Sequence, residues 1–185
     1  YTLTGSDGAD DVIEVQSEIG FVLEGASGAD TLIGGSGDDT LIGGGGDDVF
    51  VVDGGEDVID GGAGRDALDF SASVAGVQVD LSAGTLVDGE GFEDQFSSIE
   101  VVTGSDAVDT LVGSDGDDTL IGGGGADTLI GGGGEDVVDG GLGDDVLELN
   151  GSVGVTAEGG GGTDTVQLVG ATNDASLSGI ETVFG

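Results

Sequence analysis

Residues 25–69 read GASGADTLI, GGSGDDTLI, GGGGDDVFV, VDGGEDVID and GGAGRDALD, which are five nine-residue units without a break. The fourth place of each unit is glycine, the sixth is aspartate and the eighth is apolar. Five further units run from Gly104, and isolated copies begin at Gly5 and Gly159. The chain is therefore dominated by one short repeat.

The nine-residue period excludes helices and predicts a coil that alternates a turn with a short strand. The GGxGxD half needs positive φ angles and open carbonyl groups, which glycine supplies at low cost. The last three places form the strand, and its middle residue faces the opposite side from its neighbours. Two units, or 18 residues, make one turn of the coil, and turns stack about 4.8 Å apart in two parallel sheets. The predicted core residues, all in the eighth place, are Leu32, Leu41, Phe50, Ile59, Leu68, Leu111, Leu120, Leu129, Val138 and Leu147.

The two runs of units divide the chain into three parts. We expect residues 1–69 to form a first run with an N-terminal spacer, and residues 104–185 to form a second run with a C-terminal spacer. Residues 70–103 read as spacer strands that continue the roll, with a longer excursion at 82–95. The segment FSSIEVVTG at 96–104 recurs as LSGIETVFG at 177–185, which indicates a piece cut from a longer array.

These units resemble the RTX (repeats-in-toxin) calcium-binding nonapeptide family of hemolysin type, whose repeat is GGxGxDxUx. The resemblance covers twelve units, or 108 of the 185 residues. It implies an all-β, right-handed parallel β-roll, a β-solenoid with 18 residues in each coil turn. It also implies that each Ca²⁺ ion lies between loops one coil turn apart, bound by sixth-place carboxylates and loop carbonyl groups.

The sixth-place residues are therefore the metal ligands that the resemblance implies: Asp10, Asp30, Asp39, Asp48, Asp57, Asp66, Asp109, Asp118, Asp127, Asp136, Asp145 and Asp164. Each five-unit run supplies three sites, so we expect about six or more Ca²⁺ ions. The paired ligands would be Asp30 with Asp48, Asp39 with Asp57, Asp48 with Asp66, Asp109 with Asp127, Asp118 with Asp136, and Asp127 with Asp145. The sites that use Asp57 and Asp109 are expected to be the weakest, because their units depart from the glycine pattern.

Composition favours calcium independently of the resemblance. The chain has 39 acidic residues, no histidine and no cysteine, so zinc, copper and iron–sulfur sites lack their usual ligands. Calcium accepts irregular coordination by six to eight oxygen atoms, whereas magnesium does not. The net charge of −38 predicts that the metal-free chain does not hold its fold, and it makes nucleic acid and anionic membranes poor partners. No apolar stretch is long enough to predict membrane insertion.

Compartment and function follow from the calcium requirement. Extracellular calcium modules bind at about 10⁻⁴ to 10⁻³ M, so we expect a secreted, extracellular or cell-surface protein. The resemblance implies type I secretion. We expect a calcium-binding structural segment of a large adhesin, surface-layer protein or extracellular fibre. The alternative is the secretion and folding module of an exported protease, lipase or polysaccharide epimerase. We expect no enzyme in the segment itself, because histidine, cysteine and lysine are missing as nucleophiles or bases.

The ninth place is apolar early in each run and acidic later. It should face outward, yet it holds Ile33, Ile42, Val51, Val112, Ile121 and Ile130. Two interpretations stay open. The side chains tuck against neighbouring loops, or they form a lateral contact for self-association into fibres or layers once calcium lowers the repulsion.

Overall fold

The computed structural model describes residues 1–150, 154–169 and 175–185, so residues 151–153 and 170–174 of the predicted second run lie outside the described residues. This described part consists of strands, turns and loops, and none of it forms a helix long and apolar enough to cross a membrane. It divides into two compact units, which are Tyr1–Phe70 with Gly84–Val101, and Ser71–Ala83 with Val102–Gly185.

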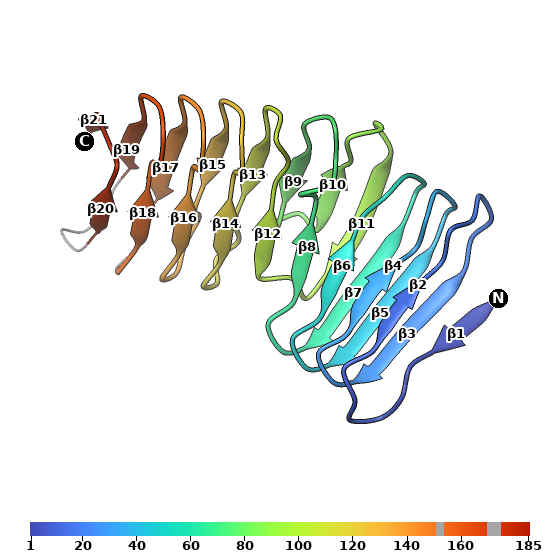
Figure 1. Cartoon of the computed structure of the whole chain (residues 1–185). Coiled ribbons are helices and arrows are strands. Elements are labelled where there is room, and N and C mark those ends of the chain that lie inside the picture. Colours follow the sequence, from blue (N-terminus) through green and yellow to red (C-terminus); the bar gives the residue numbers. More distant parts are fainter. Residues whose placement is uncertain (151–153, 170–174) are drawn as a thin grey trace. The chain divides into compact units, whose positions relative to one another are not determined.

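The first unit contains two sheets that alternate along the chain (Figure 1). One sheet orders its strands as β1 (Thr2–Thr4), β3 (Val22–Ser27), β5 (Thr40–Gly45), β7 (Val58–Ala63), β11 (Glu93–Ser97) and β10 (Thr85–Val87). The other orders them as β2 (Val12–Glu14), β4 (Thr31–Ile33), β6 (Val49–Val51) and β8 (Ala67–Asp69). Apart from β10, successive strands on one sheet are parallel, and Thr31 pairs with Val49 while Val49 pairs with Ala67. The 18-residue step confirms the predicted coil turn.

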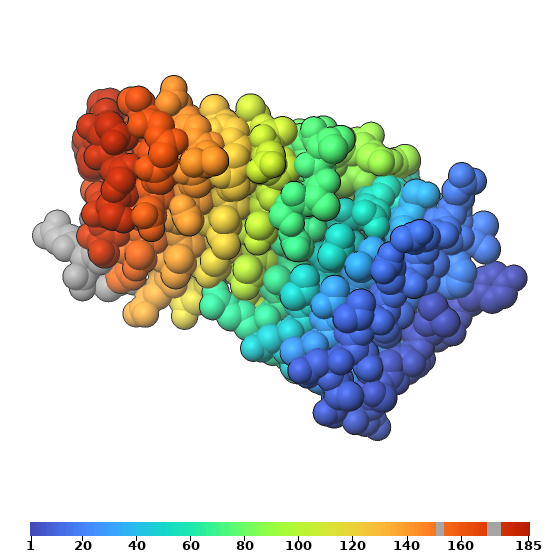
Figure 2. Space-filling model, in the orientation of Figure 1, coloured from blue at the N-terminus to red at the C-terminus, as the bar shows by residue number. Residues whose placement is uncertain are grey.

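The second unit repeats this arrangement. Its first sheet contains β9 (Gln78–Asp80), β13 (Thr110–Val112), β15 (Thr128–Ile130), β17 (Val146–Asn150), β19 (Thr165–Val169) and β21 (Thr182–Phe184). Its second sheet contains β12 (Val101–Thr103), β14 (Thr119–Ile121), β16 (Val137–Asp139), β18 (Thr156–Glu158) and β20 (Ser176–Ser178). Within each unit, successive turns of the chain lie in direct contact as bands of colour in Figure 2. Each unit is thus a parallel β-roll, as predicted.

The core of each roll is built mainly from a row of side chains at the middle of the repeat strands. All ten predicted eighth-place residues are buried, with at most 1% of their surface exposed. Leu23, Val79 and Ala157 occupy equivalent positions in the spacers, which shows that these spacers also contribute strands to the roll. The six apolar ninth-place residues are half-buried.

A hairpin departs from the parallel pattern in the first unit. β11 pairs parallel with β7 in the usual way, but β10 pairs antiparallel with β11, with Leu86 opposite Asp94. The segment 82–95, predicted as a longer excursion, therefore contains an ordered strand pair. The nonapeptide pattern holds no signal for this pairing, because an antiparallel hairpin needs only a tight turn between adjacent strands.

Glycine at the second place of a unit can allow neighbouring turns to approach closely. Gly44, in the second place of its unit, has a φ of +107°, and a Cβ there would collide with the carbonyl oxygen of Ala26 one turn away. Gly45 has no such constraint, because the nearest atom to a Cβ there is the Ala63 carbonyl oxygen at 4.0 Å. Gly44 therefore allows its turn to stack closely on the turn before it.

We predict that Gly44→Ala lowers the free energy of unfolding by about 2 kcal/mol, since it combines a left-handed backbone with a steric clash. Gly45→Ala should change it by no more than about 0.5 kcal/mol. Urea unfolding in the presence of Ca²⁺ measures both values. Equal losses in the two variants would contradict this account of turn stacking.

Candidate metal centres

The sixth-place aspartates form a hydrogen-bonded column along the edge of each sheet. Within a run, the backbone N–H of a sixth-place aspartate donates to the Oδ1 atom of the sixth-place aspartate one coil turn later, as in Asp30 to Asp48, with an N···O distance of 2.8 Å. We call this series of bonds the inner ladder. It runs parallel to the strands' own stacking direction, so it adds one side-chain bond per turn to the backbone ladder.

The inner ladder brings together all six of the predicted ligand pairs. The N···O distance is 2.8 Å in five pairs and 3.1 Å between Asp118 and Asp136. Burial accompanies the pairing. The sixth-place residues with no more than 3% of their surface exposed are Asp30, Asp39, Asp48, Asp57, Asp66, Asp109, Asp118, Asp127, Asp136, Asp145 and Asp164.

The second carboxylate oxygen of many of these residues is buried without a hydrogen-bond partner. In the repeats these orphaned atoms are the Oδ2 atoms of Asp30, Asp39, Asp48, Asp66, Asp127, Asp145 and Asp164. A buried carboxylate oxygen with no donor is costly, since burial removes its hydration without replacing it. These atoms therefore mark positions where a cation would be stabilised.

Each orphaned oxygen borders a small space above a first-place glycine. A Cβ on Gly43 would meet both Asp48 Oδ2 and the carbonyl oxygen of Gly61, which lies one turn later. Gly122 has the same relation to Asp127 Oδ2 and the Gly140 carbonyl oxygen. A side chain would fill this space, whereas glycine leaves a carboxylate oxygen and a carbonyl oxygen facing it. Both oxygen types are ligands that calcium prefers.

In three loops, a serine of the same loop donates hydrogen bonds to the second carboxylate oxygen of the aspartate. Where serine occupies the second place, its N–H and hydroxyl groups donate to Oδ2 of the sixth-place aspartate. Ser105 makes these bonds to Asp109 at 2.7 and 3.2 Å, and Ser114 makes them to Asp118 at 2.6 and 2.9 Å. Ser6 does the same for Asp11. The Gly-Ser-Asp triplet in the sequence is the signal for these self-satisfied loops.

The structure corrects the assignment of Asp10 to the sixth place of the first unit. Asp11, half-buried, takes that place instead, because its N–H donates to Asp30 Oδ1 at 2.8 Å and Val12 pairs with Thr31. Asp10 is exposed. The loop after Gly5 holds one residue more than the loop after Gly25, so counting nine from Gly5 assigns the wrong aspartate.

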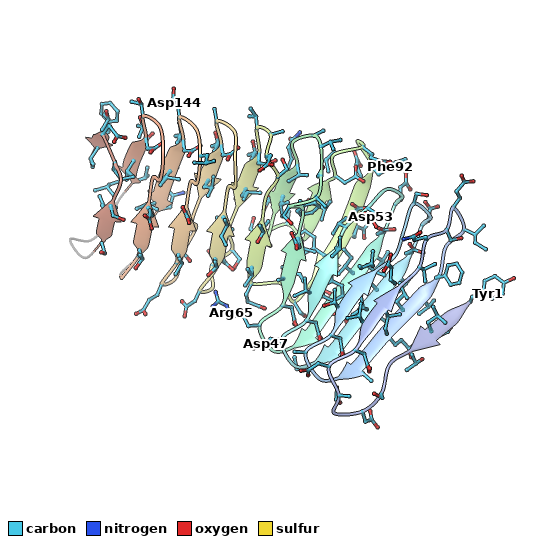
Figure 3. The ribbon with its side chains drawn as sticks, viewed as in Figure 1. Tyr1, Asp47, Asp53, Arg65, Phe92 and Asp144 are labelled. Carbon is cyan, nitrogen blue, oxygen red and sulfur yellow. The ribbon has the colours of Figure 1, made fainter. Side chains whose placement is uncertain are left out.

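Asp10 belongs instead to a second, exposed column formed by fifth-place acidic residues, which we call the outer ladder. Their Oδ1 atoms accept the N–H of the fifth-place residue one turn later, as in Asp10 from Ala29 and Asp47 from Arg65. Asp144 accepts from Thr163 at 2.8 Å. Figure 3 labels Asp47, Arg65 and Asp144 at the loop edges of their units. The outer ladder lies in solvent, so its carboxylates need no cation.

Three acidic residues outside the repeats complete the inner ladder. Glu100 Oε2 accepts the N–H of Asp66 at 3.0 Å, and Glu181 Oε2 accepts that of Asp164 at 2.7 Å. Asp94 Oδ1 accepts the N–H of Asp57 at 2.7 Å. The recurring Ile-Glu pair in the segments 96–104 and 177–185 is the sequence signal for the two glutamates. No periodic signal points to Asp94.

The two units expected to be weakest differ from the others in distinct ways. Val52 occupies the first place of the Asp57 unit and is buried, so a side chain stands where other units have glycine. In the Asp109 unit, Ser105 already hydrogen-bonds Oδ2. Each departure replaces part of the oxygen-lined space with a protein group.

Burial dominates the electrostatics of the inner ladder. It raises the pKa of Asp57 to about 7, the N–H of Asp39 opposes this increase, and the charge of Asp94 adds to it. Burial also raises the pKa of Asp66 and of Asp127 to about 6, and it raises the pKa of Asp39, Asp48 and Asp145. The carboxylates therefore hold protons more tightly in the roll than in water, because no positive charge compensates them.

The arrangement fits a hard cation that accepts a mixed oxygen ligand set. In the described residues no three His, Cys, Asp or Glu side chains gather in a group that could hold a metal ion. A cation would therefore be bound by a carboxylate with backbone carbonyl groups. Calcium accepts such irregular sets of carboxylates, carbonyls and water.

Comparison with known families agrees with this geometry. The family model of the RTX calcium-binding nonapeptide repeat matches in four overlapping copies, at residues 24–59, 42–72, 103–138 and 112–147. These copies cover 94 of the 185 residues. No curated protein matches the chain. The chain therefore belongs to the RTX calcium-binding nonapeptide repeat family, and it is a calcium-binding repeat segment of the RTX type.

Proposed function

We propose that this segment folds when it binds calcium outside the cell, and that it serves as a structural element of a large secreted or cell-surface protein, such as an adhesin, surface-layer protein or fibre. The sixth-place residues of the inner ladder, with Asp11 in place of Asp10, are the proposed ligands. The observation that best supports this proposal is the column of buried carboxylate oxygens without hydrogen-bond partners.

Electrostatic repulsion supports the folding role. Successive carboxylates of the inner ladder lie one coil turn apart, and the charge of Asp109 and of Asp145 each raises the pKa of Asp127. The unfolded chain separates these charges and hydrates them. A divalent ion held between turns compensates two negative charges, so its binding free energy adds directly to the stability of the roll.

Calcium concentration supports the extracellular location. Sites that combine few carboxylates with backbone carbonyls resemble extracellular modules, which bind at about 10⁻⁴ to 10⁻³ M. At the much lower calcium levels inside a cell the chain would stay unfolded, which suits export through a channel. Proteins of this repeat family are generally exported by type I secretion.

Composition supports a structural role over a catalytic one. The segment has no histidine, cysteine or lysine, and its one basic residue is Arg65. Nucleophilic catalysis needs a base beside the nucleophile. The sixth-place aspartates, which are the main buried acids, are already committed to the inner ladder. Within each unit, the roll extends by one coil turn for every 18 residues, which suits a structural element.

We predict that calcium induces the β structure. At about pH 8, circular dichroism should show a disordered chain in EDTA and a cooperative β signal on addition of Ca²⁺. Mg²⁺ should not replace Ca²⁺, because its rigid octahedral preference does not match these loops. A full β spectrum in EDTA would refute the calcium-dependent fold.

We predict that Asp127→Asn raises the calcium midpoint of folding roughly tenfold, equivalent to about 1.4 kcal/mol. The amide keeps an Oδ1 acceptor for Asp109 but removes the orphaned oxygen. Asp144→Asn is the matched control, since it also removes one negative charge, from the fifth place of the Asp145 unit, and keeps the acceptor for Thr163. Similar midpoints for the two variants would contradict the assignment of ligands to the inner ladder.

We predict that acid partly replaces calcium. The pKa values of Asp57, Asp66 and Asp127 in the roll, about 7, 6 and 6, exceed their unfolded values, so the folded chain binds more protons. Their contribution is fully present below about pH 4 and is lost as pH rises through about 6 to 7. In EDTA, circular dichroism should therefore show more β structure at about pH 5 than at about pH 8. A calcium-free chain that loses β signal on acidification would rule this out.

A further inference from the structure

The hairpin in the first unit places two acidic side chains in its buried face. β10 and β11 meet at a turn in which the Asp88 N–H donates to the Phe92 carbonyl oxygen at 3.1 Å. Asp88 is 4% exposed and Asp94 is 1% exposed. Both residues lie in the stretch 73–102, which the repeat family model does not match.

Strand alternation puts these two carboxylates on the same side. Leu86 is buried and lies directly opposite Asp94, and Asp88 follows Leu86 by two residues. Val87 and Glu93 lie opposite one another and face outward. Val87 is half-buried, and Glu93 is exposed. Asp88 and Asp94 are therefore diagonal neighbours on the inner face of the hairpin. They stand where an ordinary hairpin would place apolar side chains.

Each of the two carboxylates uses only one oxygen for the fold. Asp88 Oδ1 accepts three backbone N–H groups, from Glu90, Gly91 and Phe92, at 2.6 to 2.9 Å. Asp94 Oδ1 accepts the N–H of Asp57. The Oδ2 atoms of Asp88 and Asp94 are both buried and have no hydrogen-bond partner.

The surroundings of this pair are also acidic. The Glu90 carboxylate lies against Gly54, and a Cβ on Gly54 would also meet the Phe92 ring at 3.5 Å. Figure 3 labels Asp53 and Phe92 at this edge of the first unit. Burial raises the pKa of Asp94 to about 6, and the charges of Asp88 and Glu56 add to the increase. Two neighbouring carboxylates buried in this field are destabilising unless a cation compensates them.

We propose that the hairpin carries a calcium site of its own, formed by the Oδ2 atoms of Asp88 and Asp94, in a stretch that the repeat family model does not match. Two carboxylates form the protein's charged ligands there, and backbone carbonyl groups or water complete the coordination. Calcium fits because it accepts such a partial, irregular set. The ion would hold the turn of the hairpin against β11, the strand that continues the roll.

Ion counting tests the proposal in the full chain. Equilibrium dialysis with radioactive Ca²⁺ at saturation gives the number of ions bound per chain. The double variant Asp88→Asn with Asp94→Asn should bind one ion fewer than the wild-type chain. Asparagine keeps every Oδ1 hydrogen bond described above and replaces only the two orphaned oxygens. Glu93→Gln, on the outer face of the same strand, should leave the count unchanged.

An unchanged count in a double variant that keeps the wild-type β signal overturns the hairpin site. If the variant loses that signal, a crystal structure of the wild-type chain with calcium decides. An anomalous peak between Asp88 and Asp94 supports the site, and no peak there overturns it. A wild-type chain that binds no calcium at all refutes the proposed function, whereas calcium binding that ignores the hairpin variants refutes only this site.

Discussion

The bond from one sixth-place N–H to the next sixth-place carboxylate is the interaction on which each roll depends. It fixes the stacking of consecutive turns, because a donor and an acceptor of the same place must meet. It also draws the carboxylate out of water, since its Oδ1 atom must lie above a buried amide. The Oδ2 atom of the same carboxylate then loses its hydration without gaining a hydrogen-bond partner. The same bond thus creates the order of the fold and its need for a compensating charge.

The glycine pattern and the charge pattern serve this one geometry. Second-place glycines allow turns to approach closely, and first-place glycines leave space beside each orphaned oxygen. A larger core could offset the repulsion, but most three-residue strands here contribute a single buried side chain. With so thin an apolar core, stability must come from the loops. In the proposed function, calcium supplies it there.

The periodic part of this structure could be read from the sequence, and the aperiodic part could not. The repeat predicted the parallel roll, its 18-residue turn and the buried eighth-place residues from spacing, and the resemblance to the RTX family implied the six aspartate pairs. Asp10 was assigned one residue out of place because a single extra loop residue shifts the count without changing the motif. The antiparallel pairing of β10, and the burial of Asp88 and Asp94, depend on contacts between segments that share no period. Glu100 and Glu181 were visible as a recurrence, but their place in the inner ladder needed the structure.

Within a run of similar units, one coil turn can pair with more than one other turn at similar cost. A slip of 18 residues would pair every sixth-place aspartate with another aspartate and every core residue with another core residue, at almost no local cost. The irregular elements remove this ambiguity. The second run, which begins at Gly104, has Ser105 in place of the second glycine. Glu100 and Glu181, whose side chains are longer than that of aspartate, accept the N–H of the last aspartate in their columns, Asp66 and Asp164. A slipped chain would set these groups against the wrong partners, so the few residues that break the repeat are the ones that make its alignment unique.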